Sequence, residues 1–329
     1  MDQAGYKTGN SDKERTMEQY LIDSRDMKTK LAAYEWVPKN GIQAIVIAVH
    51  GMSEYMLRYA EMAEYLNTKG ILFAGIDLLG HGKSVSDESE LGYFCERDAA
   101  TVVVRDVHRL KKTVQDKYPG IPVFLFGHSM GSFIARNYIE RYGTGIDGVI
   151  IQGGGDNSGF KLGVGKALTS AVGKLKGPHY RSKLCTAATL GAYINSVKNE
   201  DSTSAWIAKR KEVVKKYDED PLCGFIFTVN GYDTLVELCS RSRDRKLLGS
   251  IPKSLPMLIV SGREDPVGEN GAGVQRMYDM YKELGMEDIK MELIDDARHE
   301  IHNEDKRYEL FDKYAVFIEN HSNKEMQAG

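Results

Sequence analysis

Three side chains that together can activate a hydroxyl group lie far apart in this chain. Ser129 is the centre of a G-x-S-x-G motif, Gly127–Gly131. A serine hydroxyl is a weak nucleophile until a base takes its proton, and histidine is well suited to that task near neutral pH. A carboxylate behind the histidine fixes its tautomer and stabilises the imidazolium. These residue types predict acyl transfer through Ser129, with His299 and Asp265 as its partners.

The residues on either side of Ser129 predict a sharp turn between a strand and a helix. The apolar run 123–126 precedes the motif, and a helical pattern begins near Phe133. The two glycines of the motif let the chain turn tightly enough to lift the serine out of the sheet. A serine in a glycine-rich turn is commonly only a turn residue, so the prediction depends on the strand and helix around it.

Asp265 and His299 each follow an apolar run that is typical of a buried strand, 257–260 and 291–294. Functional groups of a doubly wound sheet gather at the carboxyl ends of its strands, so we expect both side chains beside Ser129. The chain order serine, aspartate, histidine is that of the α/β-hydrolases. The sequence therefore predicts the α/β-hydrolase fold, a doubly wound and mostly parallel sheet.

Both partners of Ser129 have rivals nearby in the sequence. His302 lies at the expected start of a helix, where helix capping is the simpler interpretation. Pro266 holds Asp265 in an extended conformation suited to a strand-end loop. Two of the rival carboxylates are too close in sequence to His299 to reach behind its ring. The rivals of Asp265 are Glu264, Asp295 and Asp296.

Two backbone N–H groups are expected to stabilise the negative charge of a tetrahedral intermediate. One belongs to Met130, the residue after the nucleophile, and the other to Met52 in the loop after the strand 44–49, where Gly51 leaves room for substrate. Nearby histidines are interpreted as hydrogen-bonding braces rather than catalysts. These are His50, His81 and His128.

The rest of the chain alternates strands and helices, with one long interruption. We expect strands at 27–36, 71–76 and 148–151, helices at 56–69, 99–118, 274–284 and 306–320, and a frayed start over 1–20. About a hundred residues without a buried strand cannot be a plain loop in a compact fold. We interpret residues 1–152 and 251–329 as two parts of the core, and residues 153–250 as an inserted helical cap.

The predicted cap contains helical patches at 205–217 and 232–240 and apolar residues that suit an acyl chain. Glycines at 159, 163, 165 and 173 weaken any helix there and favour a mobile lid. Lysines in this stretch suit a solvated face, and contact with a lipid surface is the alternative. The expected lining residues are Phe160, Leu162, Val164, Leu168, Phe225, Ile226, Phe227 and Val229, and the lysines are Lys161, Lys166, Lys174 and Lys176.

Composition excludes several classes of protein. A net charge of −3 with mixed signs does not favour nucleic acid as a partner. No apolar run is long enough to cross a bilayer, and residues 1–25 contain no secretory signal pattern. The four cysteines show no C-x-x-C pair, which favours reduced thiols. We therefore expect a cytoplasmic location.

Five motifs in order resemble those of the monoacylglycerol lipase and bacterial lysophospholipase group of serine α/β-hydrolases. The resemblance implies hydrolysis of acyl esters, such as monoacylglycerols, lysophospholipids or small esters, without metal or cofactor. Tyr55 stands where this group commonly has histidine, and residues 217–223 resemble a D-P-L element of its cap. The motifs span His50–Tyr59, Asp77–Ser84, Gly127–Gly131, Ser261–Gly268 and Ala297–Glu300.

Other functions can use the same three side chains. A thioesterase, an amidase or peptidase and a perhydrolase share the nucleophile and differ in the bond attacked. A ligand-binding homologue without catalysis is a further alternative. Dehalogenase chemistry requires an acidic nucleophile, which Ser129 excludes. Acyl-chain length, head group and oligomeric state have no signature in the sequence.

Overall fold

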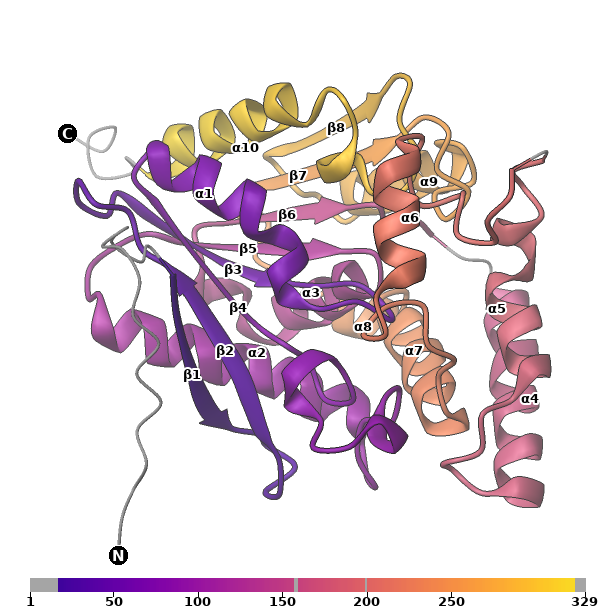
Figure 1. Ribbon diagram of the computed structural model, residues 1–329. Helices are drawn as coiled ribbons and strands as arrows, with labels where there is room; N and C mark the ends of the chain where they lie inside the picture. Colours follow the sequence, from indigo (N-terminus) through magenta and orange to yellow (C-terminus); the bar gives the residue numbers. More distant parts are fainter. Residues whose placement is uncertain (1–16, 157–158, 199, 323–329) are drawn as a thin grey trace, which may run out of the picture.

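A mixed sheet forms the centre of the molecule (Figure 1). The computed structural model describes residues 17–156, 159–198 and 200–322. Its strands are β1 (Met17–Asp23), β2 (Lys30–Trp36), β3 (Ala44–Val49), β4 (Ile71–Ile76), β5 (Val123–His128), β6 (Gly148–Gln152), β7 (Met257–Gly262) and β8 (Ile289–Ile294). In these residues the order across the sheet is β1-β2-β4-β3-β5-β6-β7-β8. The strand β2 runs antiparallel to both of its neighbours, and the other pairs are parallel.

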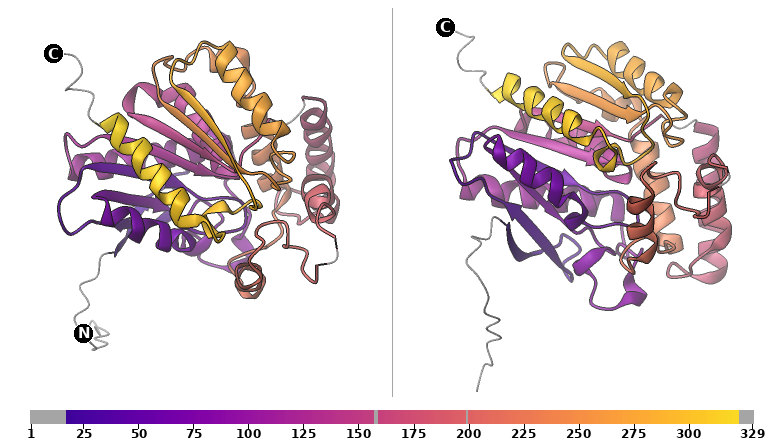
Figure 2. Two further views of the ribbon diagram at one scale, coloured as in Figure 1. Left: turned by 90° about the horizontal axis from the view of Figure 1, so that it is seen from above. Right: turned by 45° about the horizontal axis from the view of Figure 1, so that its top comes forward.

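Helices cover both faces of the sheet (Figure 2). One face packs on α1 (Ala60–Thr68) and α10 (Arg307–Ser322), and the other on α2 (Ala99–Lys117), α3 (Met130–Tyr142) and α9 (Ala272–Glu283). Side chains of β3 alternate between the two cores: Ile45 and Ile47 enter one, Val46 and Ala48 the other. A strand buried on both faces needs the unbroken apolar run seen in the sequence. The predicted doubly wound fold is confirmed.

The helical cap lies between β6 and β7. In the described residues it contains α4 (Gly159–Lys176), α5 (Lys183–Ile194), α6 (Lys211–Glu219), α7 (Val229–Arg241) and α8 (Arg245–Leu248). Both views place α4 and α5 side by side at the edge of the molecule remote from β1 (Figures 1 and 2). The exact division at residues 152 and 250 stays a prediction.

The segment whose glycines are expected to weaken a helix forms α4, a helix of 18 residues with four glycines. A Cβ on Gly165 would lie 3.2 Å from Val236 Cγ2, and one on Gly173 would lie 3.3 Å from Val229 Cγ1. Both valines belong to α7. The glycines therefore form a seam that lets α4 approach α7 closely, and this packing offsets their low helix propensity.

Two predictions were wrong. Residues 17–20 are not frayed, because they pair with β2 as part of β1, where the Tyr20 hydroxyl donates to Glu35 Oε1 at 2.5 Å. Residues 205–210 are not helical, because carbonyl groups of this stretch accept hydrogen bonds from a distant loop near residue 300. None of the helices in the described ranges has the length and apolar character needed to span a bilayer.

Candidate active site

Ser129 occupies a strained turn between β5 and α3. Its backbone has φ 54° and ψ −119°, which is unfavourable for a residue with a side chain. The neighbouring glycines have no room for a Cβ: one on Gly127 would lie 2.3 Å from Gly131 O, and one on Gly131 would lie 2.1 Å from Val49 O. This close packing holds the turn and leaves Ser129 partly exposed at the start of α3.

Asp265 and His299 form a buried pair. Nδ1 of His299 lies 3.0 Å from both carboxylate oxygens of Asp265. The Ser261 hydroxyl and the Val267 N–H also donate to that carboxylate, at 3.0 and 2.9 Å. Asp265 therefore acts only as an acceptor, which fixes the Nδ1–H tautomer of His299 and leaves Nε2 as the basic atom.

No hydrogen bond joins the Ser129 hydroxyl to His299 in the described residues, where His299 Nε2 is buried without a partner. Both side chains nevertheless line the same cavity. The structure thus brings the three predicted side chains to one place.

The histidines around the site differ in basicity. Burial lowers the pKa of His299, but the charge and hydrogen bond of Asp265 outweigh it, so the net shift is upward. Burial and the charges of neighbouring groups hold the pKa of His128 well below its usual value. Burial also lowers the pKa of His302 to about 3. Among these three, only His299 is suited to gain a proton near neutral pH.

The rivals of the catalytic pair are engaged elsewhere. Nδ1 of His302 accepts from Gln152 Nε2 at 2.7 Å beneath the site, so His302 caps no helix, contrary to the prediction. The same amide nitrogen lies 2.8 Å from Nδ1 of His128. Glu264 and Asp296 bind Lys209, and Asp295 binds Arg263.

The loop after β3 presents Met52 beside the nucleophile. A Cβ on Gly51 would lie 3.0 Å from Ser129 Cβ, so the loop runs directly past the serine. Met52 and Met130 both line the cavity, and Met130 is the first residue of α3, where N–H groups have no partner within the helix. In the described residues no protein acceptor takes a hydrogen bond from either N–H group. Their role in binding an oxyanion stays a prediction.

The Asp77–Ser84 motif braces this loop. His50 Nε2 accepts from Leu78 N–H at 2.9 Å, which confirms the interpretation of His50 as a brace. His81 Nε2 accepts from Ser53 N–H at 3.3 Å, and Asp77 accepts from Met56 N–H at 2.8 Å. Three hydrogen bonds thus join the Asp77–Ser84 motif to the loop that carries Met52.

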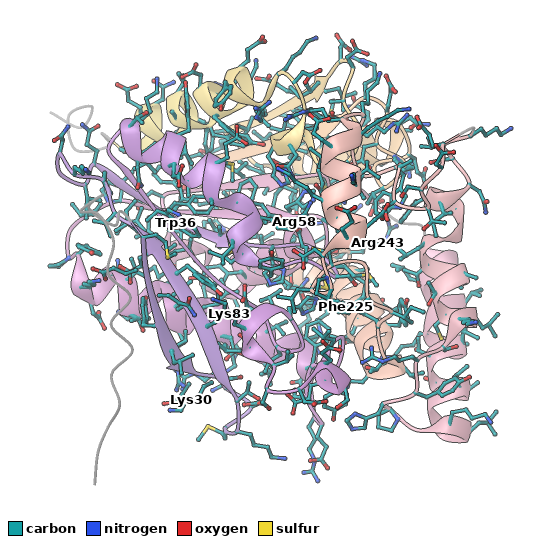
Figure 3. The ribbon with its side chains drawn as sticks, in the orientation of Figure 1. Lys30, Trp36, Arg58, Lys83, Phe225 and Arg243 are labelled. Atoms are coloured by element: carbon teal, nitrogen blue, oxygen red, sulfur yellow. The ribbon has the colours of Figure 1, made fainter. Side chains whose placement is uncertain are left out.

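A buried ion cluster lies under the same loop, and the sequence reasoning missed it. Arg58 donates to Glu54 at 2.7 Å and makes a two-pronged contact with Glu300, also at 2.7 Å. Glu54 accepts from Gly51 N–H at 2.6 Å. Arg58 lies beside α6, with Tyr217 under its guanidinium (Figure 3). The spacing of Glu54 and Arg58, four residues apart, was the available signal, but nothing local points to Glu300.

The cap is fastened to this loop as well. Tyr55, the departure from the family pattern, donates its hydroxyl to Asp220 Oδ2 at 2.6 Å. The Ser53 hydroxyl donates to Phe225 O at 2.8 Å, and the Tyr217 hydroxyl donates to Ser53 O at 3.1 Å. The element that resembles the D-P-L motif therefore contacts the predicted oxyanion loop directly.

A cavity of about 730 Å³ lies between the core and the cap. Ser129, His299, Met52 and Met130 form its floor, and apolar side chains of α4, α5 and α7 form a large part of its walls. Of the predicted lining residues, Leu162, Val164, Leu168 and Phe225 are confirmed. Phe227 and Val229 are instead buried in packing, Ile226 is partly exposed, and the side chain of Phe160 lies outside the described residues.

Comparison with known proteins agrees with this architecture. The family model described as Serine aminopeptidase, S33 matches residues 40–306. The monoglyceride lipase of Homo sapiens is 27% identical over 272 residues, which are 82% of this chain and 79% of that protein. A monoglyceride lipase homolog of Monkeypox virus is 27% identical over 270 residues, 82% of this chain and 86% of that protein.

Solved structures show the same arrangement. A thermostable carboxyl esterase from Bacillus coagulans, in complex with glycerol, superimposes with a TM-score of 0.87 at 26% identity and covers 94% of this chain and 99% of its own. The family model spans most of the chain, including the strands that carry Ser129, Asp265 and His299. The chain therefore belongs to the serine aminopeptidase S33 family of α/β-hydrolases and is a serine carboxylester hydrolase.

Proposed function

We propose that the protein hydrolyses esters of an apolar acyl chain and a small polar alcohol, such as monoacylglycerols, through an acyl-enzyme on Ser129. One observation carries the proposal: the Asp265–His299 pair leaves Nε2 without a partner, and His299 lines the same cavity as the strained Ser129. Lysophospholipids and small esters share the same reactive bond and belong to the same proposal.

The first half of the reaction forms the acyl-enzyme. His299 Nε2 takes the proton of the Ser129 hydroxyl as its oxygen attacks the ester carbonyl. The N–H groups of Met52 and Met130 stabilise the oxyanion. The intermediate then collapses, the carbon–oxygen bond to the alcohol breaks, and His299 returns the proton to the departing alcohol.

The second half releases the acid. A water molecule gives a proton to His299 Nε2 and attacks the acyl carbonyl, and the same N–H groups hold the new oxyanion. When this intermediate collapses, the proton passes to Ser129 and the carboxylic acid leaves. Asp265 keeps its negative charge throughout and stabilises the imidazolium in both halves.

The cavity supports an apolar acyl chain. Its volume lies within the range of about 300–1,000 Å³ that is typical of small-molecule sites. The walls formed by α4, α5 and α7 include Leu162, Leu168 and Val236, whereas polar groups such as Glu54 and Tyr217 lie on the side of the Met52 loop. Relatives named monoglyceride lipase, and a related esterase with bound glycerol, favour glycerol as the alcohol.

Kinetics with a panel of esters test this proposal. Ser129→Ala should lower kcat/KM for monooleoylglycerol and p-nitrophenyl butyrate by at least about 10⁴-fold, because the nucleophile is lost. Ser240→Ala, which removes an exposed hydroxyl of α7, is the matched control and should act like the wild type. Turnover by Ser129→Ala at more than a hundredth of the wild-type rate would contradict the proposal.

Amide hydrolysis is the second candidate, because the family description names an aminopeptidase. The same triad can attack an amide when the amine is protonated as it leaves. Aminoacyl p-nitroanilides, acyl-CoA thioesters and esters compared at equal concentration distinguish the alternatives. We expect kcat/KM to be highest for the esters.

The tip of the cap suits contact with a lipid–water interface. Leu175 in α4 and Leu184 in α5 are 81% and 61% exposed. Lys174, Lys176 and Lys183 lie beside them in sequence and are exposed. Apolar side chains flanked by cations bind the surface of anionic lipid aggregates, where acyl esters collect. We propose that the tip of the cap contacts such aggregates transiently.

A further inference from the structure

Residues 205–210, named here the strap, cross the loop that carries His299. The N–H of Glu300 donates to Ile207 O at 2.6 Å. The Arg298 guanidinium donates to Ala205 O at 2.6 Å and to a second strap carbonyl, that of Ala208, at 3.3 Å. These contacts come from the two residues directly adjacent to His299, one through its backbone and one through its side chain.

Further contacts anchor the far end of the strap. The N–H of Lys209 donates to Glu304 Oε1 at 2.8 Å, and the same oxygen accepts from the N–H of Arg298 at 3.0 Å. Arg210 donates to Asn303 O at 3.1 Å. Each described residue of α4 and α5, apart from Thr169 and Cys185, is instead at least partly exposed. Hydrogen bonds thus join the strap to the His299 loop from Ala205 to Arg210.

The strap places the indole of Trp206 against the imidazole of His299. The ring centroids are 5.1 Å apart and the planes meet at 40°. Tyr193 of α5 lies next to the indole at 5.5 Å, and His128 contacts the imidazole at 4.7 Å. Trp206 also lines the cavity. The imidazole of His299 therefore contacts both an indole and a second imidazole.

Burial and nearby charges act in opposite directions on the pKa of His299, which contacts Trp206. Burial lowers the pKa of His299, whereas Asp265, Glu300 and Glu54 raise it. Other ionisable neighbours are Arg58, which is paired with both glutamates, the low-pKa histidines His128 and His302, and Tyr193, whose pKa is raised by burial. A cation over an indole face is stabilised most where water is excluded.

We propose that Trp206 is a positioning residue for His299, which fixes the orientation of the imidazole and stabilises the imidazolium formed when His299 takes the serine proton. The inference rests on the proposed role of His299 as the base. It assigns part of the cap to the catalytic machinery. The acyl chain and the alcohol can then exchange past α4 and α5 while the strap keeps its contact with the base.

Fluorescence tests the contact without relying on turnover. The chain contains two tryptophans, so the wild-type emission minus that of Trp206→Phe isolates Trp206. A protonated imidazole in contact with an indole quenches its fluorescence. The difference emission should rise between about pH 5 and about pH 9. The midpoint of this rise should match the pH at which kcat/KM falls to half its maximum on the acid side. His299→Gln should abolish this titration.

Kinetics test the positioning role. With dissolved p-nitrophenyl butyrate, Trp206→Leu should lower kcat about 3- to 30-fold with little change in KM, and should move the acid limb to lower pH, because the imidazolium loses its partner. Trp206→Phe should recover most of the loss. The control Tyr308→Leu changes an aromatic residue of α10 and should act like the wild type.

Two results would overturn the inference: a difference emission that stays constant with pH, or a Trp206→Leu enzyme with the wild-type kcat and acid limb. Circular dichroism of each variant separates loss of folding from loss of positioning, and Trp206→Phe keeps the test valid if the leucine variant unfolds. Failure of the proposed function gives a different pattern, because His299→Gln would then retain turnover.

Discussion

At the scale of single residues, surroundings decide which of several similar side chains can do chemistry. Asp265 is buried against His299, whereas Glu264, Asp295 and Asp296 are bound to exposed cations. Burial lowers the pKa values of His128 and His302, and the carboxylate beside His299 reverses that effect. The assignment of acid and base thus depends on partners and not on residue type.

The pH dependence of catalysis should reveal the base. Only neutral His299 can accept a proton, and its pKa is raised above the usual 6.5. The kcat/KM of a dissolved ester should therefore fall as the pH drops through a value above 6.5. In Asp265→Asn, the largest effect that opposes burial is lost, so the acid limb should move to lower pH while kcat drops by about 10³–10⁴-fold. An unchanged limb in this variant would contradict the pairing.

The sequence located part of the site because order and spacing carry that information. Strand ends meet at one edge of a parallel sheet, so the sequence alone predicts that Ser129, Asp265 and His299 lie close together. Their catalytic roles remain predictions. The contact of Arg58 with Glu300 joins residues 242 positions apart, and no local pattern encodes such a pairing. Trp206 was missed for the same reason.

At the scale of elements, the ion cluster ties the Met52 loop to the His299 loop. Arg58→Met leaves Glu54 and Glu300 buried without a counter-ion, which should cost about 3–5 kcal/mol of unfolding free energy in urea titrations. The control Arg263→Met removes an exposed partner of Asp295 and should cost about 0–1 kcal/mol. Equal losses in the two variants would show that the cluster has no special structural role.

In two parts of the cap, local helix propensity does not predict the structure. Glycines predicted a weak helix over α4, yet Gly165 and Gly173 provide the close approach to α7 that stabilises it. Residues 205–210 have a helical pattern, but the His299 loop takes their carbonyl groups. In both places a tertiary partner, invisible in the local sequence, decides the outcome.

The exposed tip of the cap should matter only at interfaces. Leu175→Asp combined with Leu184→Asp should reduce hydrolysis of monoacylglycerol in anionic vesicles at least about fivefold, because less apolar surface can enter the lipid. Hydrolysis of dissolved p-nitrophenyl butyrate should not change. Val316→Asp, at a position of α10 that is 54% exposed, is the control. A parallel loss with both substrates would instead indicate damage to the site.

At the scale of the whole molecule, the doubly wound sheet brings the loops of the site together, and the inserted cap covers the cavity. The unbroken apolar strands build a core on each face, and their order brings the loops after β3, β5, β7 and β8 to one cavity. These runs made the fold predictable, whereas β1, with its exposed and irregular pattern, was not recognised. The cap closes the cavity and contributes Trp206 to it.

Covalent labelling tests the central claim most directly. A fluorophosphonate forms a phosphorus–oxygen bond with an activated serine and releases fluoride, so the labelled peptide identifies the nucleophile. We predict one label per chain, on Ser129, with esterase activity lost in proportion to labelling. A label on another residue, or full esterase activity in a fully labelled enzyme, would contradict the account.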